Sequence, residues 1–363
     1  MDGLLCLSIF NVSQMSKNSA IIYYGGFIRF GGVFTHVKAI EKELLKKQWD
    51  VRVITLDSLP IWCRYIPHLV EKLVNTFNRP LGFFYKGSIT KVLYKSYFNT
   101  KVDLRIFEDI YLSWNSKNPS ITVLHAIWSD NLQAYSVRKR AINKLKIKEV
   151  EVISKINHSI VTVSYPYLKY LENEHFSLDL SKKIDVVELG VDQSIYITNC
   201  VRNFKSIVYS GSFESRKNVT FLLEVFKNLY LIDPSYKLTL IGAGPDKQKL
   251  IDFTKSNRLP VKFLGKLSHE DVISELPSHG IYLHTSIKES FSYSLLEAKL
   301  LWLKTCAYAK LEVPSEFIDV AINSFNVDEW CNGIMNIDWT PTVFNAEKFT
   351  VEKMISSLLR LAN

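Results

Sequence analysis

Short apolar runs alternate with segments of helical periodicity along the whole chain. In the first half, apolar residues recur at helical spacing over 35–47 and again over 138–156, which predicts two amphipathic helices. The β-branched and apolar runs around them predict strands. These predicted strands cover 21–24, 51–55, 121–125, 159–163 and 185–188.

The same alternation starts again in the second half. Strands are predicted at 207–209, 238–241, 261–264 and 281–284, and helices at 217–231, 245–257, 268–276 and 294–303. Strands that alternate with helices indicate βαβ units and parallel sheets covered on both faces. Two such series predict an α/β protein with two Rossmann-like, doubly wound domains joined near 190–205. Ligands of such sheets bind beyond the carboxyl ends of the strands.

Composition adds a charge asymmetry to this plan. The 363 residues carry a formal net charge of +9. Residues 1–190 hold 26 Lys and Arg against 17 Asp and Glu, whereas 191–363 holds 19 of each kind. All the excess positive charge therefore lies in the first half, and it favours an anionic partner there.

The five cysteines are scattered and include no C-x-x-C pair, which argues against a disulfide framework or a zinc site and fits a reducing cytosol. No apolar run approaches the roughly 20 residues of a membrane-spanning helix. The apolar start, 4–10, is short and has no basic residue before it, so a signal peptide is not expected. Whether 1–17 belongs to the fold stays open. We expect a cytoplasmic protein.

Two glutamates flank a predicted helix start after the strand 281–284. Glu289 lies in the loop, and Glu297 lies eight residues later, inside the helix. The free N–H groups of Phe291, Ser292 and Tyr293 form a terminus that can bind phosphate, and each carboxylate can accept hydrogen bonds from hydroxyl groups. This arrangement suits a diphosphate between ribose and sugar. The structural alternative is an acidic helix start beside a solvated loop.

A second candidate group is the segment GSFESRK, which begins at Gly211, follows a strand and opens a helix. Lys217, together with Arg216, can neutralise a leaving diphosphate. A helix that merely begins with basic residues is the alternative, although the helix dipole disfavours cations at this end. The chain contains no Asp-x-Asp pair for a metal-bound diphosphate. We therefore expect neither a metal nor another cofactor.

Three further residues follow strands. Gly32 belongs to a glycine pair that lets a ligand approach the backbone closely. Gly242 belongs to a partial G-x-G, which we interpret as a turn near the base or ribose rather than a dinucleotide fingerprint. His125 ends a strand and can bond a sugar hydroxyl or phosphate. A tight turn needs the same glycines, and a lone histidine is often structural, so these alternatives stay open.

The ordered series of segments resembles glycosyltransferase family 4, the large retaining family with the GT-B fold. The segments are GGV, HVKAIEKELLKKQWDVRVIT, ITVLHAIWSD, SIVTVS, VVELGVD, SGSFESRKN, KLTLIGAGP, VKFLGKLSHEDV and ESFSYSLLEA. The resemblance implies an acceptor-binding domain over 1–195 and a domain over 196–340 that binds a nucleotide-sugar donor. It also implies a C-terminal helix within 341–363 that packs toward the first domain.

The resemblance also implies a role for each matched position. Glu297 would hold the ribose hydroxyls, and Glu289 would contact the transferred sugar near the backbone of 291–293. Lys217 would bind the diphosphate, His125 would lie on the sugar side, and Gly32 would donate its N–H to phosphate. The implied reaction is metal-independent transfer of a sugar with retained anomeric configuration.

Three positions depart from the family pattern. Ser212 stands where an Arg is frequent, Ser290-Phe291-Ser292 replaces Gly-Phe-Gly, and the bulky segment K-L-L-W-L-K follows Glu297. Ser212 motivates an alternative, a catalytically inactive partner that binds a glycan or another transferase. A nucleotide-sugar epimerase shares the architecture and is a third possibility, which the E-x7-E pattern disfavours.

Basic and aromatic residues gather in two parts of the first half. Residues 61–101 hold seven Lys and Arg and one acid among many aromatics, and 138–148 holds six basic residues and no acid. This mixture suits the surface of an anionic bilayer; a solvated basic face is the alternative. The family resemblance implies that the first domain binds the acceptor. This mixture of residues therefore indicates a lipid-diphosphate-linked glycan acceptor, such as that of an O-antigen or capsule, at the inner face of the cell membrane. No nucleic-acid-binding motif occurs, so nucleic acid is not expected.

Overall fold

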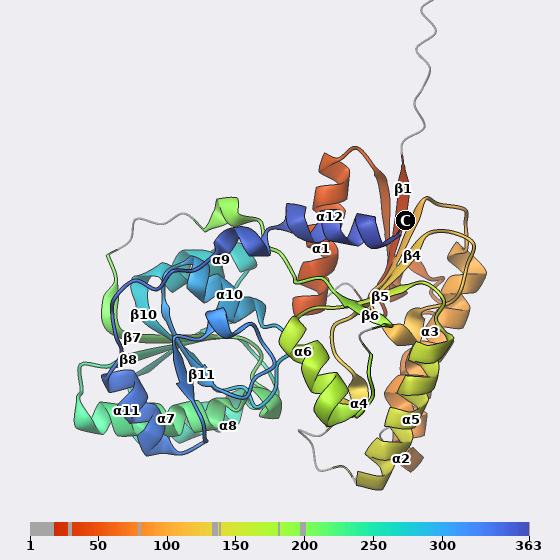
Figure 1. Ribbon diagram of the computed structural model, residues 1–363. Coiled ribbons are helices and arrows are strands. Elements are labelled where there is room, and N and C mark those ends of the chain that lie inside the picture. The colour runs from red at the N-terminus through yellow and green to blue at the C-terminus, as the bar shows by residue number, and fades with distance from the viewer. Residues whose placement is uncertain are drawn as a thin grey trace, which may run out of the picture.

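A computed structural model describes residues 18–27, 31–78, 81–132, 137, 139–180, 182–196 and 201–362 (Figure 1). The features at 1–17, position 138, Cys6 and Cys200 lie outside these residues. The described cysteines, Cys63, Cys306 and Cys331, are buried and free. Within the described ranges, no helix combines the length and the apolar character needed to cross a membrane.

The first domain is built on a parallel sheet of six strands in the order β2-β1-β3-β4-β5-β6. The strands are β1 (Ser19–Tyr23), β2 (Asp50–Ile54), β3 (Leu104–Phe107), β4 (Ser120–Leu124), β5 (Ser159–Thr162) and β6 (Ile184–Val186). The helices are α1 (Gly32–Lys46), α2 (Ile66–Asn78), α3 (Gly82–Phe98), α4 (Trp128–Asn131), α5 (Lys139–Lys155) and α6 (Tyr165–Tyr170). The sheet and its crossovers confirm the predicted doubly wound plan.

Strand β3 lies in the middle of this sheet and was not predicted. Arg105 interrupts its apolar run, yet this residue is only 2% exposed. Its guanidinium donates to Ser116 Oγ at 2.6 Å, to Asn99 Oδ1 at 3.0 Å and to the Thr100 carbonyl at 2.5 Å. Because these partners come from the segments that precede β3 and β4, a charged residue can occupy a buried strand.

The second domain repeats the architecture with the strand order β12-β11-β10-β7-β8-β9, all parallel. The strands are β7 (Asn203–Ser210), β8 (Lys237–Ile241), β9 (Val261–Gly265), β10 (His279–His284), β11 (Lys304–Tyr308) and β12 (Val320–Ile322). The helices are α7 (Val219–Ile232), α8 (Lys247–Ser256), α9 (His269–Glu275), α10 (Tyr293–Leu300) and α11 (Val327–Met335). The crossover at β7 and β10 places the ends of these two neighbouring strands at the same edge, where ligands of such sheets bind.

The last helix, α12 (Val351–Ala362), leaves the second domain and packs against α1 and β4 of the first (Figure 1). Its buried residues recur at helical spacing: Val351, Met354, Ile355 and Leu358. Ser159 Oγ donates to the Leu361 carbonyl at 2.7 Å. The chain therefore crosses between the domains twice, once after β6 and once before α12.

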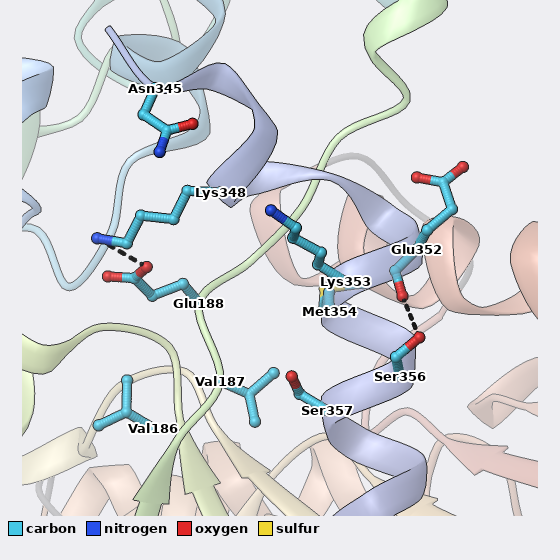
Figure 2. Close-up of a pocket in the computed structure, with 10 residues that line it drawn as sticks. All are labelled: Val186, Val187, Glu188, Asn345, Lys348, Glu352, Lys353, Met354, Ser356 and Ser357. Atoms are coloured by element: carbon cyan, nitrogen blue, oxygen red, sulfur yellow. Dashed lines mark hydrogen bonds and ion pairs between the residues drawn. The ribbon is translucent and has the colours of Figure 1, made fainter.

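The two crossings, residues 187–196 and 336–350, lie against each other, and together they are called the hinge. Val191 and Thr350 form an isolated parallel bridge, and a Cβ at Gly190 would overlap the Thr350 carbonyl oxygen. Beside them is an open pocket of about 580 Å³ (Figure 2). It is lined by Val186, Val187, Glu188, Asn345, Lys348, Glu352, Lys353, Met354, Ser356 and Ser357. No residue predicted for the donor site lines this pocket, which belongs to the hinge.

Candidate active site

The loop 285–292, which connects β10 to α10, is joined to the turn that precedes α7. Thr285 Oγ1 donates to the Lys217 carbonyl at 3.1 Å, and the Ile287 N–H donates to the Arg216 carbonyl at 3.0 Å. These bonds connect segments about 70 positions apart in sequence. The E-x7-E segment and the predicted cations therefore form one local unit at the carboxyl ends of β7 and β10.

Glu289 is the centre of this unit. Its carboxylate forms an ion pair with Lys217 and lies 3.5 Å from Arg216 Nη1 and 3.4 Å from His284 Nε2. Burial alone would raise the pKa of Glu289, but Lys217, His284 and Arg216 hold it well below the usual value. Burial lowers the pKa of His284, which favours its neutral form. Glu289 is thus an ionised carboxylate between two cations.

The start of α10 has an unusual backbone. Ser292 has φ 69°, in the left-handed region, and its Oγ accepts from the Leu295 N–H at 3.4 Å. The family pattern has glycine here, which adopts this conformation without strain. The ring of Phe291 points into the core, 5.2 Å from the ring of Phe317. Only the backbone of Phe291 can therefore serve the ligand role predicted for it.

Tyr293 brings this loop against the first domain. A Cβ at Gly32 would lie 3.6 Å from Tyr293 Cδ2, so the glycine that begins α1 faces the residue that begins α10. The buried Tyr293 hydroxyl has no hydrogen-bond partner among the described residues. Two helix starts, one from each domain, therefore lie next to each other, as expected for a site between domains.

His125 belongs to a buried cluster in the first domain. Its Nε2 lies 2.7 Å from Glu108 Oε2, and His36 Nδ1 lies 2.9 Å from the same oxygen. Burial would raise the pKa of Glu108, but the two histidines lower it to about 2. Burial lowers the pKa of His125. A charged carboxylate therefore accepts a hydrogen bond from each ring and fixes the orientation of both.

The same three residues are a group of possible metal ligands among the described residues, because their ligand atoms all lie within 4.8 Å of one another. Both histidine nitrogens already lie at hydrogen-bond distance from one oxygen, so hydrogen bonding accounts for the cluster. His36 and Glu108 were not predicted as site residues. Glu108 directly follows β3, the strand that the sequence pattern did not reveal.

Glu297 lies in the second turn of α10. His269 Nε2 lies 2.8 Å from Glu297 Oε1, and the Tyr196 hydroxyl lies 3.5 Å from the same oxygen. The hydrogen bond to Glu297 raises the pKa of His269 despite partial burial. Neither partner was predicted. His269 falls in the matched segment VKFLGKLSHEDV, whereas Tyr196 comes from the hinge and no local pattern marks it.

The remaining predicted glycines pack against each other. A Cβ at Gly242 would overlap the Gly211 carbonyl oxygen. This close backbone contact is enough to require glycine at 242, with or without a ligand. Ser212 Oγ donates to Glu214 Oε1 at 2.7 Å. Arg216, rather than a residue at 212, provides the second cation beside Glu289.

Comparison with known structures places the molecule in a class. The chain superposes on sucrose-phosphate synthase from Thermosynechococcus elongatus with a TM-score of 0.70 and 16% identity, covering 96% of this chain and 95% of that one. Two parallel six-stranded sheets with flanking helices and a returning C-terminal helix define the GT-B fold. The expected fold class is confirmed.

Sequence comparison adds to the structural match. Residues 198–327 match the model of the family "Glycosyl transferases group 1". One component of the phosphatidylinositol N-acetylglucosaminyltransferase of Arabidopsis thaliana is 27% identical over 38% of this chain. N-acetyl-alpha-D-glucosaminyl L-malate synthase from Bacillus anthracis is 24% identical over 42% of it. The matches span only 32% and 40% of these two relatives.

Proposed function

We propose that this protein is a retaining glycosyltransferase that moves a sugar from a nucleotide-sugar donor to a growing, lipid-linked cell-surface glycan. The observation that carries this proposal is the ionised, buried Glu289 held between Lys217 and Arg216 at the start of α10. The two cations, the Glu289 carboxylate and the N–H groups at the start of α10 meet at the carboxyl ends of β7 and β10. A diphosphate attached to a polyol needs this combination.

The geometry suggests a role for each group. When the bond between the sugar and the diphosphate breaks, negative charge develops on the leaving diphosphate. Lys217, Arg216 and the N–H groups at 291–293 lie where they can stabilise that charge. Glu289 accepts hydrogen bonds from sugar hydroxyls. Glu297, now paired with His269, accepts them from the ribose.

The first domain supplies the opposite side of the site. Gly32 leaves room for a phosphate beside the first turn of α1, and its N–H can donate to that phosphate. His125, oriented by Glu108, bonds the sugar. Because protein cations and helix N–H groups can neutralise the diphosphate, the proposed reaction needs no metal.

The names of the two curated relatives support a choice of first donor. Both are named for N-acetylglucosaminyl groups, and a matching solved structure from Anabaena holds UDP. UDP-N-acetylglucosamine should therefore be tested first. The relative from Arabidopsis thaliana is named for a phosphatidylinositol acceptor, which supports testing lipid acceptors.

An exposed apolar stripe supports placement at a membrane surface. Ile61, Tyr65, Leu69 and Leu73 follow one another at intervals of four residues along α2 and the turn before it, and are 55–74% exposed. Trp62, 69% exposed, lies beside them. Together these five residues form the α2 stripe. With the basic residues of 61–101, it suits insertion into an anionic leaflet at the cytoplasmic face.

The proposal is tested by release of nucleoside diphosphate from a panel of nucleotide sugars. We expect release with at least one donor, and Lys217→Ala should lower kcat about 10²- to 10³-fold, because one charge-stabilising donor is lost. Lys249→Ala, an exposed position on α8, is the matched control and should leave kcat unchanged. An unchanged kcat in Lys217→Ala would contradict the site.

Ser212 favours a second candidate, an inactive partner protein that keeps the fold. Calorimetry with nucleoside diphosphates separates the two. An active transferase binds at least one of them, and an inactive partner binds none.

A further inference from the structure

The Lys288 side chain reaches from the second domain into the first. Its Nζ lies 2.8 Å from Asp130 Oδ1, 3.4 Å from Glu312 Oε1 and 3.5 Å from the centre of the Tyr170 ring. Asp130 is only 1% exposed. An ion pair this deeply buried, formed between domains, restricts their relative position more than a solvated surface pair can.

The acceptor of this pair is itself held in place. Asp130 lies on α4, five residues after His125. The Tyr170 hydroxyl donates to Asp130 Oδ1 at 2.6 Å, and the Tyr167 hydroxyl lies 3.4 Å from Oδ2. Tyr167 also accepts from the Ile127 N–H at 2.9 Å. The carboxylate is thus part of the rigid segment that follows the strand carrying His125.

The residue on the other side of Glu289 is also bound to the first domain. Ser164 Oγ lies at hydrogen-bond distance from two carbonyl oxygens, 2.6 Å from that of Ser290 and 3.0 Å from that of Glu312. Arg216 Nη1 donates to the Lys288 carbonyl at 3.3 Å. The backbone around Glu289 is therefore attached at two places. Residue 288 connects it to the turn that holds Arg216 and Lys217, and residues 288 and 290 connect it to the first domain.

We propose that Lys288 is a positioning residue, whose pair with Asp130 sets the location of Glu289 relative to His125. This inference rests on the proposed function, because it concerns the alignment of that site. Lys288 uses its ammonium for Asp130 and Glu312 and need not contact the donor. A reacting group displaced by about 1 Å can lose about 100-fold in rate, so loss of the pair should act on turnover.

The test compares Lys288→Met with wild type, using UDP-N-acetylglucosamine as donor and release of UDP as the readout. We expect kcat to fall about 100-fold. The Kd of UDP, measured by calorimetry, should change less than about threefold, because all the proposed nucleotide contacts except that of Gly32 lie in the second domain. Lys288→Arg keeps the charge and should recover part of kcat. Asp130→Asn should reproduce the loss, and the double variant should lose no more than either single variant.

Lys205→Met is the control. Lys205 lies 2.6 Å from Asp233 and sits over the Tyr236 ring, but all three residues belong to the second domain. Its kcat should stay within about twofold of wild type. A Lys288→Met variant with wild-type kcat, or with UDP affinity and kcat reduced in parallel, would overturn the positioning role.

Small-angle scattering provides a readout that needs no turnover. Without ligand, Lys288→Met should have a larger radius of gyration than wild type and Lys205→Met, because the domains separate more readily. An unchanged radius would contradict the interdomain pair. If wild type neither binds a nucleoside diphosphate nor turns over any donor, the proposed function fails, whereas the scattering result still decides whether Lys288 holds the domains together.

Discussion

At the scale of single residues, burial and neighbouring cations have opposite effects on the pKa of the site carboxylates. Glu289 is buried, which favours its neutral form, yet two cations and a neutral histidine keep it ionised. Glu108 is ionised in the same way between two histidines. Each domain thus presents a fixed carboxylate near the boundary, and each carboxylate orients the groups proposed to contact the donor.

Ser292 gives a prediction for stability at this scale. Its left-handed backbone costs about 1 kcal/mol or more in a non-glycine residue, whereas its helix cap, at 3.4 Å, is weak. Ser292→Gly should therefore raise the free energy of unfolding by about 0.5–1 kcal/mol, because exchange of a Ser cap for Gly costs only a few tenths. Urea unfolding measures the change.

Ser292→Ala is the control for this prediction. It keeps the strain and removes the cap, so it should destabilise the protein. Equal stability of the alanine and glycine variants would show that the backbone strain is absent.

At the scale of elements, buried carboxyl groups make folding stability depend on pH. Glu149 on α5 accepts from the Tyr111 hydroxyl and from the Ser129 N–H, and burial raises its pKa to about 7. Burial also raises the pKa values of Asp109 and Glu312 to about 7. These groups hold protons more tightly in the folded state than in the unfolded one.

The sign of the pH effect follows from these raised pKa values. Between about pH 4.5 and 7 these three groups bind more protons in the folded state, so their contribution to the free energy of unfolding falls as pH rises through this window. Buried histidines whose pKa is lowered, such as His158 and His175, contribute with the opposite sign. A shift of this size corresponds to on the order of 3 kcal/mol for Glu149. In urea unfolding between pH 5 and 7.5, Glu149→Gln should make the slope of the free energy of unfolding against pH more positive than in wild type, whereas exposed Glu352→Gln should not. A slope unchanged in Glu149→Gln would contradict the raised pKa.

At the scale of the whole molecule, the α2 stripe and the basic first half predict binding to anionic vesicles. Sedimentation with phosphatidylserine-containing liposomes should carry the protein down at low salt and less at high salt, because salt screens the attraction. Replacing Leu69 and Leu73 with serine should reduce the pelleted fraction.

Leu231 and Ile232 provide the control pair for this experiment. They are similarly exposed, at 70% and 61%, but lie on α7 of the second domain. Serine at both positions should leave sedimentation unchanged. Absence of the wild-type protein from the pellet at every salt concentration would count against the membrane surface.

The sequence by itself determined the local parts of this molecule. Apolar runs and helical periodicity located most strands, because burial selects those residue types directly. The pattern missed β11 and β12, and it missed β3, where Arg105 occupies a buried strand. The return of α12 to the first domain was expected from the family resemblance and not from the apolar pattern. Motif order indicated Glu289, Glu297, Lys217 and His125, since each follows a strand end.

Only the tertiary structure decided which of these groups meet. The sequence spacing between Lys217 and Glu289 does not indicate how far apart the two side chains lie in space. Their contact arises because the crossover makes β7 and β10 neighbours. The partners His36, Glu108, His269 and Tyr196 come from separate elements, and no local pattern pairs them. Lys288 and Asp130 belong to different domains, so their pair exists only because two separate sheets pack together. Periodicity reports burial of a side chain, whereas the identity of its neighbour depends on topology.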